Sequence, residues 1–232
     1  MKKLVILLTI LILGLTLRLY NLDSRPVGFT WDEAALGYNA YSLMKTGKDE
    51  HGQILPVVFK SFGDYKPGLY IYLTVPTVKI FGLNEFATRL PSAILGTLLI
   101  IVVYILCKYL TPSPSPKLGE GNARGEVFGL CSALLLAINP WSIHFSRGAW
   151  EANVALFLTT LAVLLFLKKR YLFSSIFFAL TFWTYQGSKM FTPLFVLSLL
   201  FIYKPNIKKL IWSGLIGLLM LIPILWSFSS QS

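Results

Sequence analysis

LVILLTILILGLTLRLY, residues 4–20, is the stretch that decides the fold class. It follows Lys2 and Lys3 and comes close to the roughly 20 apolar residues that a membrane-spanning helix needs. A secretory signal peptide is the alternative, because it also begins with cations and an apolar run. No small-residue cleavage site follows, because the next residues are Arg18-Leu19-Tyr20-Asn21. We therefore predict an uncleaved first span.

The composition extends this prediction to the whole chain. The 232 residues are 55% hydrophobic and 13% charged, with a mean hydropathy of +0.67, whereas a soluble domain carries about 25% charged residues. The net charge of +11 does not indicate nucleic acid as a partner, because the cations lie in short clusters between apolar runs. Membrane lipid is the expected surroundings, since such clusters set the orientation of membrane proteins.

Seven apolar runs are predicted to span the bilayer: 4–20, 90–110, 127–145, 152–168, 171–187, 190–204 and 209–228. The apolar stretch 68–82 is shorter and contains Pro76 and Lys79. If it does not span, eleven of the 21 basic residues fall on one side, and the loop 21–89 lies opposite with equal numbers of acids and bases. The positive-inside rule therefore makes 68–82 a helix at the outer interface.

The predicted fold class is an all-α integral membrane protein of about seven transmembrane helices, forming one polytopic domain over 1–232. We expect a multi-pass protein of the cell membrane with its N-terminus in the cytoplasm. Its first outer loop, at about 21–89, is expected to carry interfacial helices. A Pro/Ser/Gly-rich cytoplasmic linker is expected at about 111–126. We also expect the chain to continue past Ser232, which directly follows a span.

Trp31-Asp32-Glu33 opens the most polar part of this loop. Thr30 and Glu33 have the spacing of a helix capping box, which predicts a helix that runs to Lys45 and stops at Gly47. Asp32 and Glu33 are then either favourable charges at a helix N-terminus or carboxylates able to accept a proton at the membrane surface.

Three further outer-loop side chains are candidates. Lys66, in Asp64-Tyr65-Lys66-Pro67, precedes the interfacial helix, where an ammonium either attracts a lipid phosphate or only extends toward water. The loop ends in FGLNEFATRLPS, residues 81–92. Arg89 lies there at the mouth of the second span, able to pair with Glu85 or with a phosphate.

The order of these pieces resembles the membrane glycosyltransferases of the C-type (GT-C) fold, in particular the protein mannosyltransferase and aminoarabinose transferase group. The resemblance covers about 20–100 strongly and continues in register to about 195. It implies a transferase that takes a sugar from a polyprenyl-phosphate donor on the outer face. By this resemblance Asp32 is the general base with Glu33 beside it, while Lys66 and Arg89 match the phosphate-binding cations. The chain departs at Gly68, where many relatives have a second proline.

Two other outer loops add candidates. Arg147 and Glu151 match in type an arginine and acid of the family: Arg147 suits a phosphate, and Glu151 suits orienting it or helping to bind a cation. A salt bridge that caps the fourth span is the alternative. His144 is a supporting candidate, as is Glu85, and Lys189 in the loop 184–190 is a further phosphate ligand.

The expected reaction is an inverting transfer to an acceptor hydroxyl of unidentified origin. It requires no cofactor, although a divalent cation is compatible with it. A transporter or flippase of a lipid-linked species is the competing hypothesis, but the span centres lack the ionisable residues that such proteins place at mid-depth. An inactive fragment of a transferase is the third.

Overall fold

The computed structural model describes residues 2–111 and 123–229, which are mainly helical. The helices are α1 (Lys2–Leu19), α2 (Trp31–Thr46), α3 (Leu69–Phe81), α4 (Glu85–Leu110), α5 (Ala123–Ile138), α6 (Pro140–Arg147), α7 (Glu151–Leu167), α8 (Tyr171–Phe182), α9 (Ser188–Tyr203) and α10 (Ile207–Ser229). Two short strands, β1 (Val58–Ser61) and β2 (Asp64–Pro67), form an antiparallel hairpin. The linker predicted at about 111–126 lies largely outside the described residues, and α5 already begins at Ala123.

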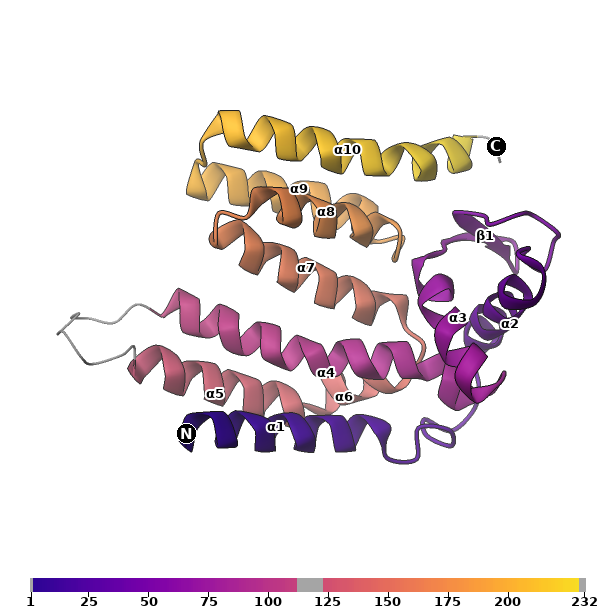
Figure 1. Cartoon of the computed structure of the whole chain (residues 1–232), viewed down its shortest axis with the longest axis horizontal. Coiled ribbons are helices and arrows are strands. Elements are labelled where there is room, and N and C mark those ends of the chain that lie inside the picture. The colour runs from indigo at the N-terminus through magenta and orange to yellow at the C-terminus, as the bar shows by residue number, and fades with distance from the viewer. Residues whose placement is uncertain (1, 112–122, 230–232) are drawn as a thin grey trace.

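The long helices run side by side as a bundle, and α2, α3 and the hairpin gather at one end of it (Figure 1). We call this the loop end. The opposite end, called here the basic end, carries the N-terminus and the turns α7–α8 and α9–α10. These two turns contain Lys168, Lys169, Arg170 and Lys204. The cation clusters and the long polar loop therefore lie at opposite ends of the bundle, as the charge pattern predicts.

The all-α membrane fold is confirmed, but the number of spans is not. Within the described chain, two helices are long and apolar enough to cross a membrane: α4 and the Leu210–Ser227 part of α10. A third qualifies if the bent pair α5–α6 counts as one span. Helices α3, α7, α8 and α9 are apolar but shorter. The count of seven therefore stays a prediction.

The span predicted at 127–145 is interrupted. α5 and α6 meet at an angle of 58°, where Asn139 caps α6 by accepting a hydrogen bond from the Ser142 backbone N–H (2.9 Å) and Pro140 begins it. Proline at the first helical position cannot continue the preceding helix. Buried Arg18 stabilises the bend, because its guanidinium donates to the Ala137 carbonyl at 3.1 Å and the Leu136 carbonyl at 3.2 Å.

The predicted helices of the outer loop are confirmed. Thr30 and Glu33 form the complete capping box of α2, and Gly47 ends the helix in the left-handed conformation at φ 69°. Glycine adopts this conformation without the steric cost that a Cβ brings. The stretch 68–82 forms α3, and its place at the outer interface stays a prediction.

The hairpin was not predicted. Phe62 and Gly63 connect its strands with positive φ at both positions, 48° and 83°, as a two-residue type I′ turn requires. Gly68 then lets the chain pass close to Phe59, whose Cε2 would lie 2.4 Å from a Cβ at position 68. The departure from the family pattern at this position is thus accommodated by tight packing of the hairpin.

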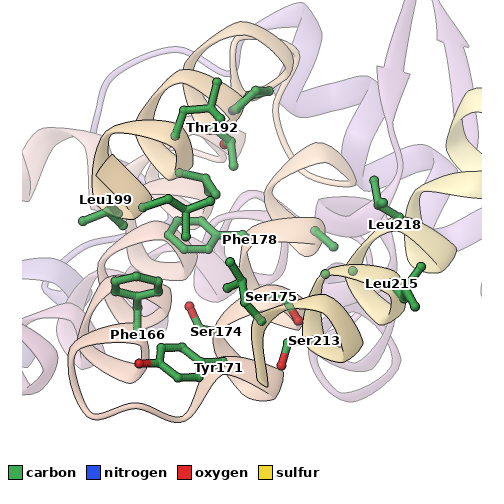
Figure 2. Close-up of a pocket in the computed structure, with 18 of the residues that line it drawn as sticks. Phe166, Tyr171, Ser174, Ser175, Phe178, Thr192, Leu199, Ser213, Leu215 and Leu218 are labelled. Atoms are coloured by element: carbon green, nitrogen blue, oxygen red, sulfur yellow. The ribbon is translucent and has the colours of Figure 1, made fainter. Parts of the chain in front are cut away.

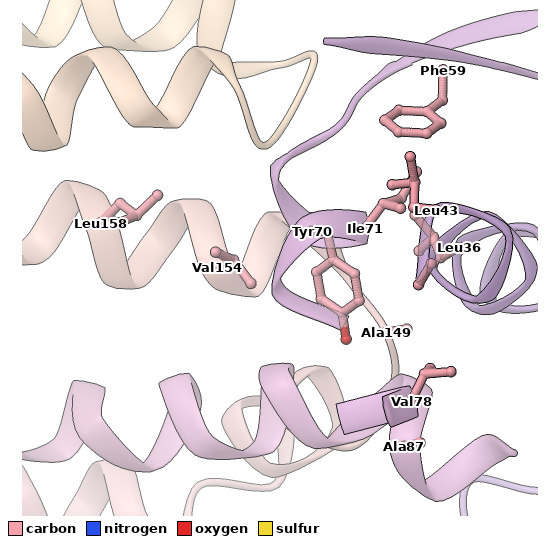
Figure 3. Close-up of a cluster of buried hydrophobic side chains, with 11 residues drawn as sticks. Leu36, Leu43, Phe59, Tyr70, Ile71, Val78, Ala87, Ala149, Val154 and Leu158 are labelled. Carbon is pink, nitrogen blue, oxygen red and sulfur yellow. The ribbon is translucent and has the colours of Figure 1, made fainter. Parts of the chain in front are cut away.

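A buried apolar cluster joins the loop end to the bundle (Figure 3). The cluster includes Leu36 on α2, Phe59 on β1, Tyr70 on α3 and Val154 on α7, with Tyr70 between Val154 and Leu36 in the view. The Tyr70 hydroxyl also donates to the Thr88 carbonyl of α4 at 2.9 Å. The first outer loop is therefore packed as part of the bundle, which gives its polar side chains defined positions.

Candidate active site

The N-terminus of α2 separates its two carboxylates. Successive helical residues point about 100° apart, so the Asp32 side chain is 54% exposed while that of Glu33 is 4% exposed. The Thr30 hydroxyl accepts from the Glu33 backbone N–H at 3.2 Å, and Glu33 Oε2 accepts from the Thr30 backbone N–H at 3.1 Å. The capping box thus turns Glu33 inward and leaves Asp32 at the surface.

Glu33 forms a buried ion pair with Arg89. Arg89 Nε donates to Oε1 at 2.9 Å and Nη2 to Oε2 at 3.1 Å. The Ala149 backbone N–H also donates to Oε1, at 3.0 Å. Burial alone would raise the pKa of Glu33, but the hydrogen bonds from Arg89, Ala149 and Thr30 outweigh it and hold that pKa below its usual value.

The structure places Arg89 in the interior. The sequence had suggested instead that Arg89 lies at the mouth of a span and binds a phosphate. Its guanidinium also donates to the Leu22 carbonyl at 3.1 Å and the Gly28 carbonyl at 2.7 Å, and only 1% of the side chain is exposed. Arg89 therefore joins the start of the loop, α2 and α4. Its ionic partner is Glu33 rather than Glu85, which lies exposed in the first turn of α4.

Asp32 has a different partner. Lys66 of β2 donates a hydrogen bond to Asp32 Oδ1, and the Lys66 side chain is only 15% exposed. The hairpin is held in place by the loop that precedes α9, because Gln186 donates to the Tyr65 carbonyl and the Leu69 backbone N–H donates to the Trp183 carbonyl at 2.8 Å. The fold thereby brings together Asp32 and Lys66, which are 34 positions apart.

Glu151 approaches the same place from another direction. It is the first residue of α7, partly buried, and it interacts electrostatically with Lys66, Asp32 and Asp64. Burial raises the pKa of the Glu151 carboxyl, and the positive charge of Lys66 only partly offsets this. Asp32, Lys66 and Glu151 therefore form one electrostatic group at the loop end.

We expect Glu151→Gln to raise the unfolding temperature at about pH 7 and to leave it unchanged at about pH 4. The folded pKa of Glu151 lies above the unfolded value near 4.5. The folded state therefore binds more protons between these values, and wild-type stability falls as pH rises through that window. Thermal unfolding of the wild type and the variant at the two pH values measures the difference in unfolding temperature. The titration of Glu33 is the same in both proteins and cancels in this comparison. Glu85→Gln is the control, because Glu85 is also the first residue of its helix but is exposed; an equal gain there would contradict the assignment.

Lys189, in the first turn of α9, interacts electrostatically with Asp64 of the hairpin. Burial lowers the pKa of the Lys189 ammonium, whereas the charge of Asp64 on the hairpin acts in the opposite direction. The sequence had singled out Lys189 but not Asp64, because nothing in the sequence shows that the hairpin reaches the loop before α9.

Two other predicted residues lie apart from the group. Arg147 donates to the carbonyls of Leu17 (2.9 Å), Asn21 (3.1 Å) and Arg25 (3.1 Å), so it caps the end of α1 rather than pairing with Glu151. His144 is exposed on α6, with its ring 5.8 Å from that of Phe145. Arg18, to which the sequence had assigned no role, is fully buried; its place in an apolar run was the available signal.

An apolar groove of about 550 Å³ lies between α7 and α9. Ala152, which follows Glu151, and Ser188, which precedes Lys189, line its loop end. The groove continues along α7 to Val163, a rise of roughly 17 Å at 1.5 Å per residue. Phe191 and Phe195 of α9 form the facing wall. Within the described residues, no three His, Cys, Asp or Glu side chains are grouped so as to hold a metal ion.

A helical membrane protein with a carboxylate–lysine site at one end of its bundle is the class that this geometry defines. The sequence model of the dolichyl-phosphate-mannose-protein mannosyltransferases matches residues 8–226. The chain belongs to this family and is a glycosyltransferase of the mannosyltransferase type. No curated protein and no solved structure matches it.

Proposed function

We propose that the chain transfers a sugar from a polyprenyl-phosphate donor to an acceptor hydroxyl, with Asp32 as the general base. The observation that carries the proposal is the Asp32–Lys66 ion pair. Both side chains interact electrostatically with Glu151, the residue before Ala152, which lines the apolar groove. A base and a phosphate-binding cation are the two groups that this reaction needs.

The groove between α7 and α9 suits the prenyl chain of the donor. Its wall is mainly apolar, with aromatic rings on one side, and its lining includes Ala152 and Ser188, the sequence neighbours of Glu151 and Lys189. A chain in this groove would place its terminal phosphate among the side chains at the loop end. Lys66 and Lys189 are then the cations that bind the phosphate. Arg89 and Arg147 do not contact it: Arg89 holds Glu33, and Arg147 binds backbone carbonyls at the end of α1.

The Asp32–Lys66 pair supplies a simple order of events. An incoming phosphate competes for the Lys66 ammonium and frees the Asp32 carboxylate. The acceptor O–H then gives its proton to Asp32 while its oxygen bonds to the anomeric carbon. The bond from that carbon to the phosphate oxygen breaks, and polyprenyl phosphate leaves with the electron pair. Attack opposite the leaving group inverts the anomeric configuration.

The loop end is proposed to face the outside of the cell membrane, and the N-terminus the cytoplasm. The clustering of cations at the basic end supports this orientation. Labelling of a cysteine placed at exposed His51 by a membrane-impermeant maleimide checks it, and labelling only after the membrane is opened would reverse the assignment.

The function is tested by the release of polyprenyl phosphate from lipid-linked sugars, beginning with the mannose donor, in membranes that contain the chain. Release that depends on the chain supports the transferase. If the donor moves between leaflets without losing its sugar, the chain is a flippase instead.

Lys66→Gln is expected to lower kcat/KM for the donor by roughly tenfold to a hundredfold, because a hydrogen bond to a charged group contributes about 1.5–3 kcal/mol. Lys189→Gln should lower it by a smaller factor. Lys60→Gln is the matched control, since Lys60 is exposed on the neighbouring strand of the same hairpin. Steady-state kinetics with varied donor measure the effect, and equal losses in Lys60→Gln and Lys66→Gln would refute a phosphate-binding role.

A further inference from the structure

A second apolar cavity lies away from the carboxylate–lysine site, between α8, α9 and α10 (Figure 2). It has a volume of about 610 Å³. Tyr171 and Phe166 lie at its basic end, and Thr192 lies toward the loop end of α9. The cavity thus runs along the bundle axis, beginning where the two basic turns are.

The wall of the cavity is almost entirely apolar, and several of its hydroxyl groups are engaged in hydrogen bonds within the protein. Ser174 donates to the Ala162 carbonyl at 2.8 Å, Ser175 donates to the Leu172 carbonyl at 2.9 Å, and the Thr192 hydroxyl bonds to that of Thr181 at 2.9 Å. Most of the surface that a ligand meets is therefore hydrocarbon. An aliphatic chain fits such a wall, because it needs dispersion contacts and no hydrogen bonds.

The length of the cavity matches one leaflet of a bilayer. On α8 its lining extends from Tyr171 to Phe182, a rise of roughly 17 Å at 1.5 Å per residue. Half of a hydrocarbon core that is about 30 Å thick is about 15 Å. At the loop end the Trp183 indole N–H donates to the Met220 carbonyl at 2.9 Å, which ties α8 to α10 beside the cavity.

The basic end carries cations that can bind the negatively charged headgroup of a lipid. Lys168, Lys169 and Arg170 fill the α7–α8 turn, directly before Tyr171, and Lys204 lies in the α9–α10 turn. All four side chains are exposed, and within the described part of the chain none forms a salt bridge with a carboxylate. Cations at headgroup depth attract anionic lipids.

We propose that this cavity binds an anionic phospholipid, with one acyl chain between α8 and α10 and the phosphate on Lys168, Lys169 and Arg170. The ligand is distinct from the sugar donor, whose phosphate is assigned to the loop end of the bundle. Binding stabilises the contact between α8 and α10, because an acyl chain fills space that the side chains leave open.

Gly214 offers a direct test. It lines the cavity, and a Cβ at this position would have no other atom within 4 Å. A side chain can therefore start at this position without a clash at its Cβ, and we expect the ring of Gly214→Phe to occupy the cavity. Leu219→Phe is the matched control, because Leu219 is 61% exposed on the same helix and does not line the cavity.

The experiment reconstitutes the full chain with phosphatidylglycerol or phosphatidylcholine that carries a photoreactive group on the same acyl chain, and maps the labelled peptides. We expect phosphatidylglycerol to label α8 and α10 roughly tenfold more than phosphatidylcholine, because cations at headgroup depth favour lipids with a net negative charge. Gly214→Phe should lose this labelling, whereas Leu219→Phe should keep it. The triple change of Lys168, Lys169 and Arg170 to glutamine should remove the preference for phosphatidylglycerol, and arginine at positions 168 and 169 should retain it.

Three results would overturn the proposal. The first is equal labelling by the two lipids, and the second is labelling that survives in Gly214→Phe. The third is cross-linking of two copies of the chain through α10, which would make the cavity part of an interface. None of these readouts depends on sugar transfer, so the lipid site can fail without affecting the proposed reaction.

Discussion

Sugar transfer is expected to fall by about 10²–10⁴-fold when Asp32 is replaced by asparagine, the typical contribution of one positioned general base. The asparagine oxygen still accepts a hydrogen bond from Lys66, so the local geometry is retained. The side chain is 54% exposed, and the change therefore removes no buried contact. What is lost is the ability to accept the proton of the acceptor hydroxyl. Single-turnover release of polyprenyl phosphate at saturating donor measures the chemical step.

Two variants separate this effect from a general disturbance of the loop. Asp23→Asn removes an exposed carboxylate elsewhere in the same loop and should leave the rate unchanged. Glu33→Gln should keep turnover at temperatures at which the variant remains folded, because Glu33 has no exposed oxygen for the acceptor. Unchanged turnover in Asp32→Asn would mean that another group is the base, and Glu151 would be the next to test.

The largest effect on stability is expected for Arg89→Gln. The change leaves Glu33 buried without its cation and removes the donors to the Leu22 and Gly28 carbonyls. Breaking a buried ion pair by removal of one partner costs about 3–5 kcal/mol. For a chain of this size that corresponds to an unfolding temperature lower by roughly 10 °C. Thermal unfolding of the purified protein in detergent measures the shift.

A double-mutant cycle distinguishes the ion pair from the rest of the packing. If Glu33 and Arg89 stabilise each other, the double change to glutamine should cost less than the sum of the single changes, with a coupling of about 0.5–3 kcal/mol. Arg25→Gln is the control, since Arg25 is exposed in the same loop and its replacement should shift the unfolding temperature little. Strict additivity of the two changes would show that the pair contributes no more than its separate contacts.

Local sequence patterns predicted the outer-loop helices well. The capping box at Thr30 and Glu33, the left-handed glycine at Gly47 and helix α3 all follow from interactions within a few residues. Such interactions do not depend on the rest of the fold. The break at Asn139-Pro140 was missed, although its signal was local, because the apolar run around it outweighed that signal.

The partners of the charged residues were less predictable. Glu85, four positions before Arg89, was the near candidate for its ion pair, but Glu33 occupies that place from 56 positions away. In the same way, Arg147 caps α1 across a separation of more than 120 positions instead of pairing with Glu151. The sequence therefore identified these residues as charged groups that need a partner, but it did not identify the partners.

Hydropathy, charge clusters and motif order were enough to establish a helical membrane protein, its two chemically distinct ends and the glycosyltransferase family. The first two properties follow from whether each segment requires lipid or water, which its composition determines, and the family follows from the order of the motifs. The roles of neighbouring carboxylates depended on packing. Asp32 and Glu33 are adjacent and chemically alike, yet the capping geometry of α2 and the position of Arg89 bury one and expose the other. Only the folded chain sets that difference, because it arises from contacts between α2, α4 and the hairpin that are far apart in sequence.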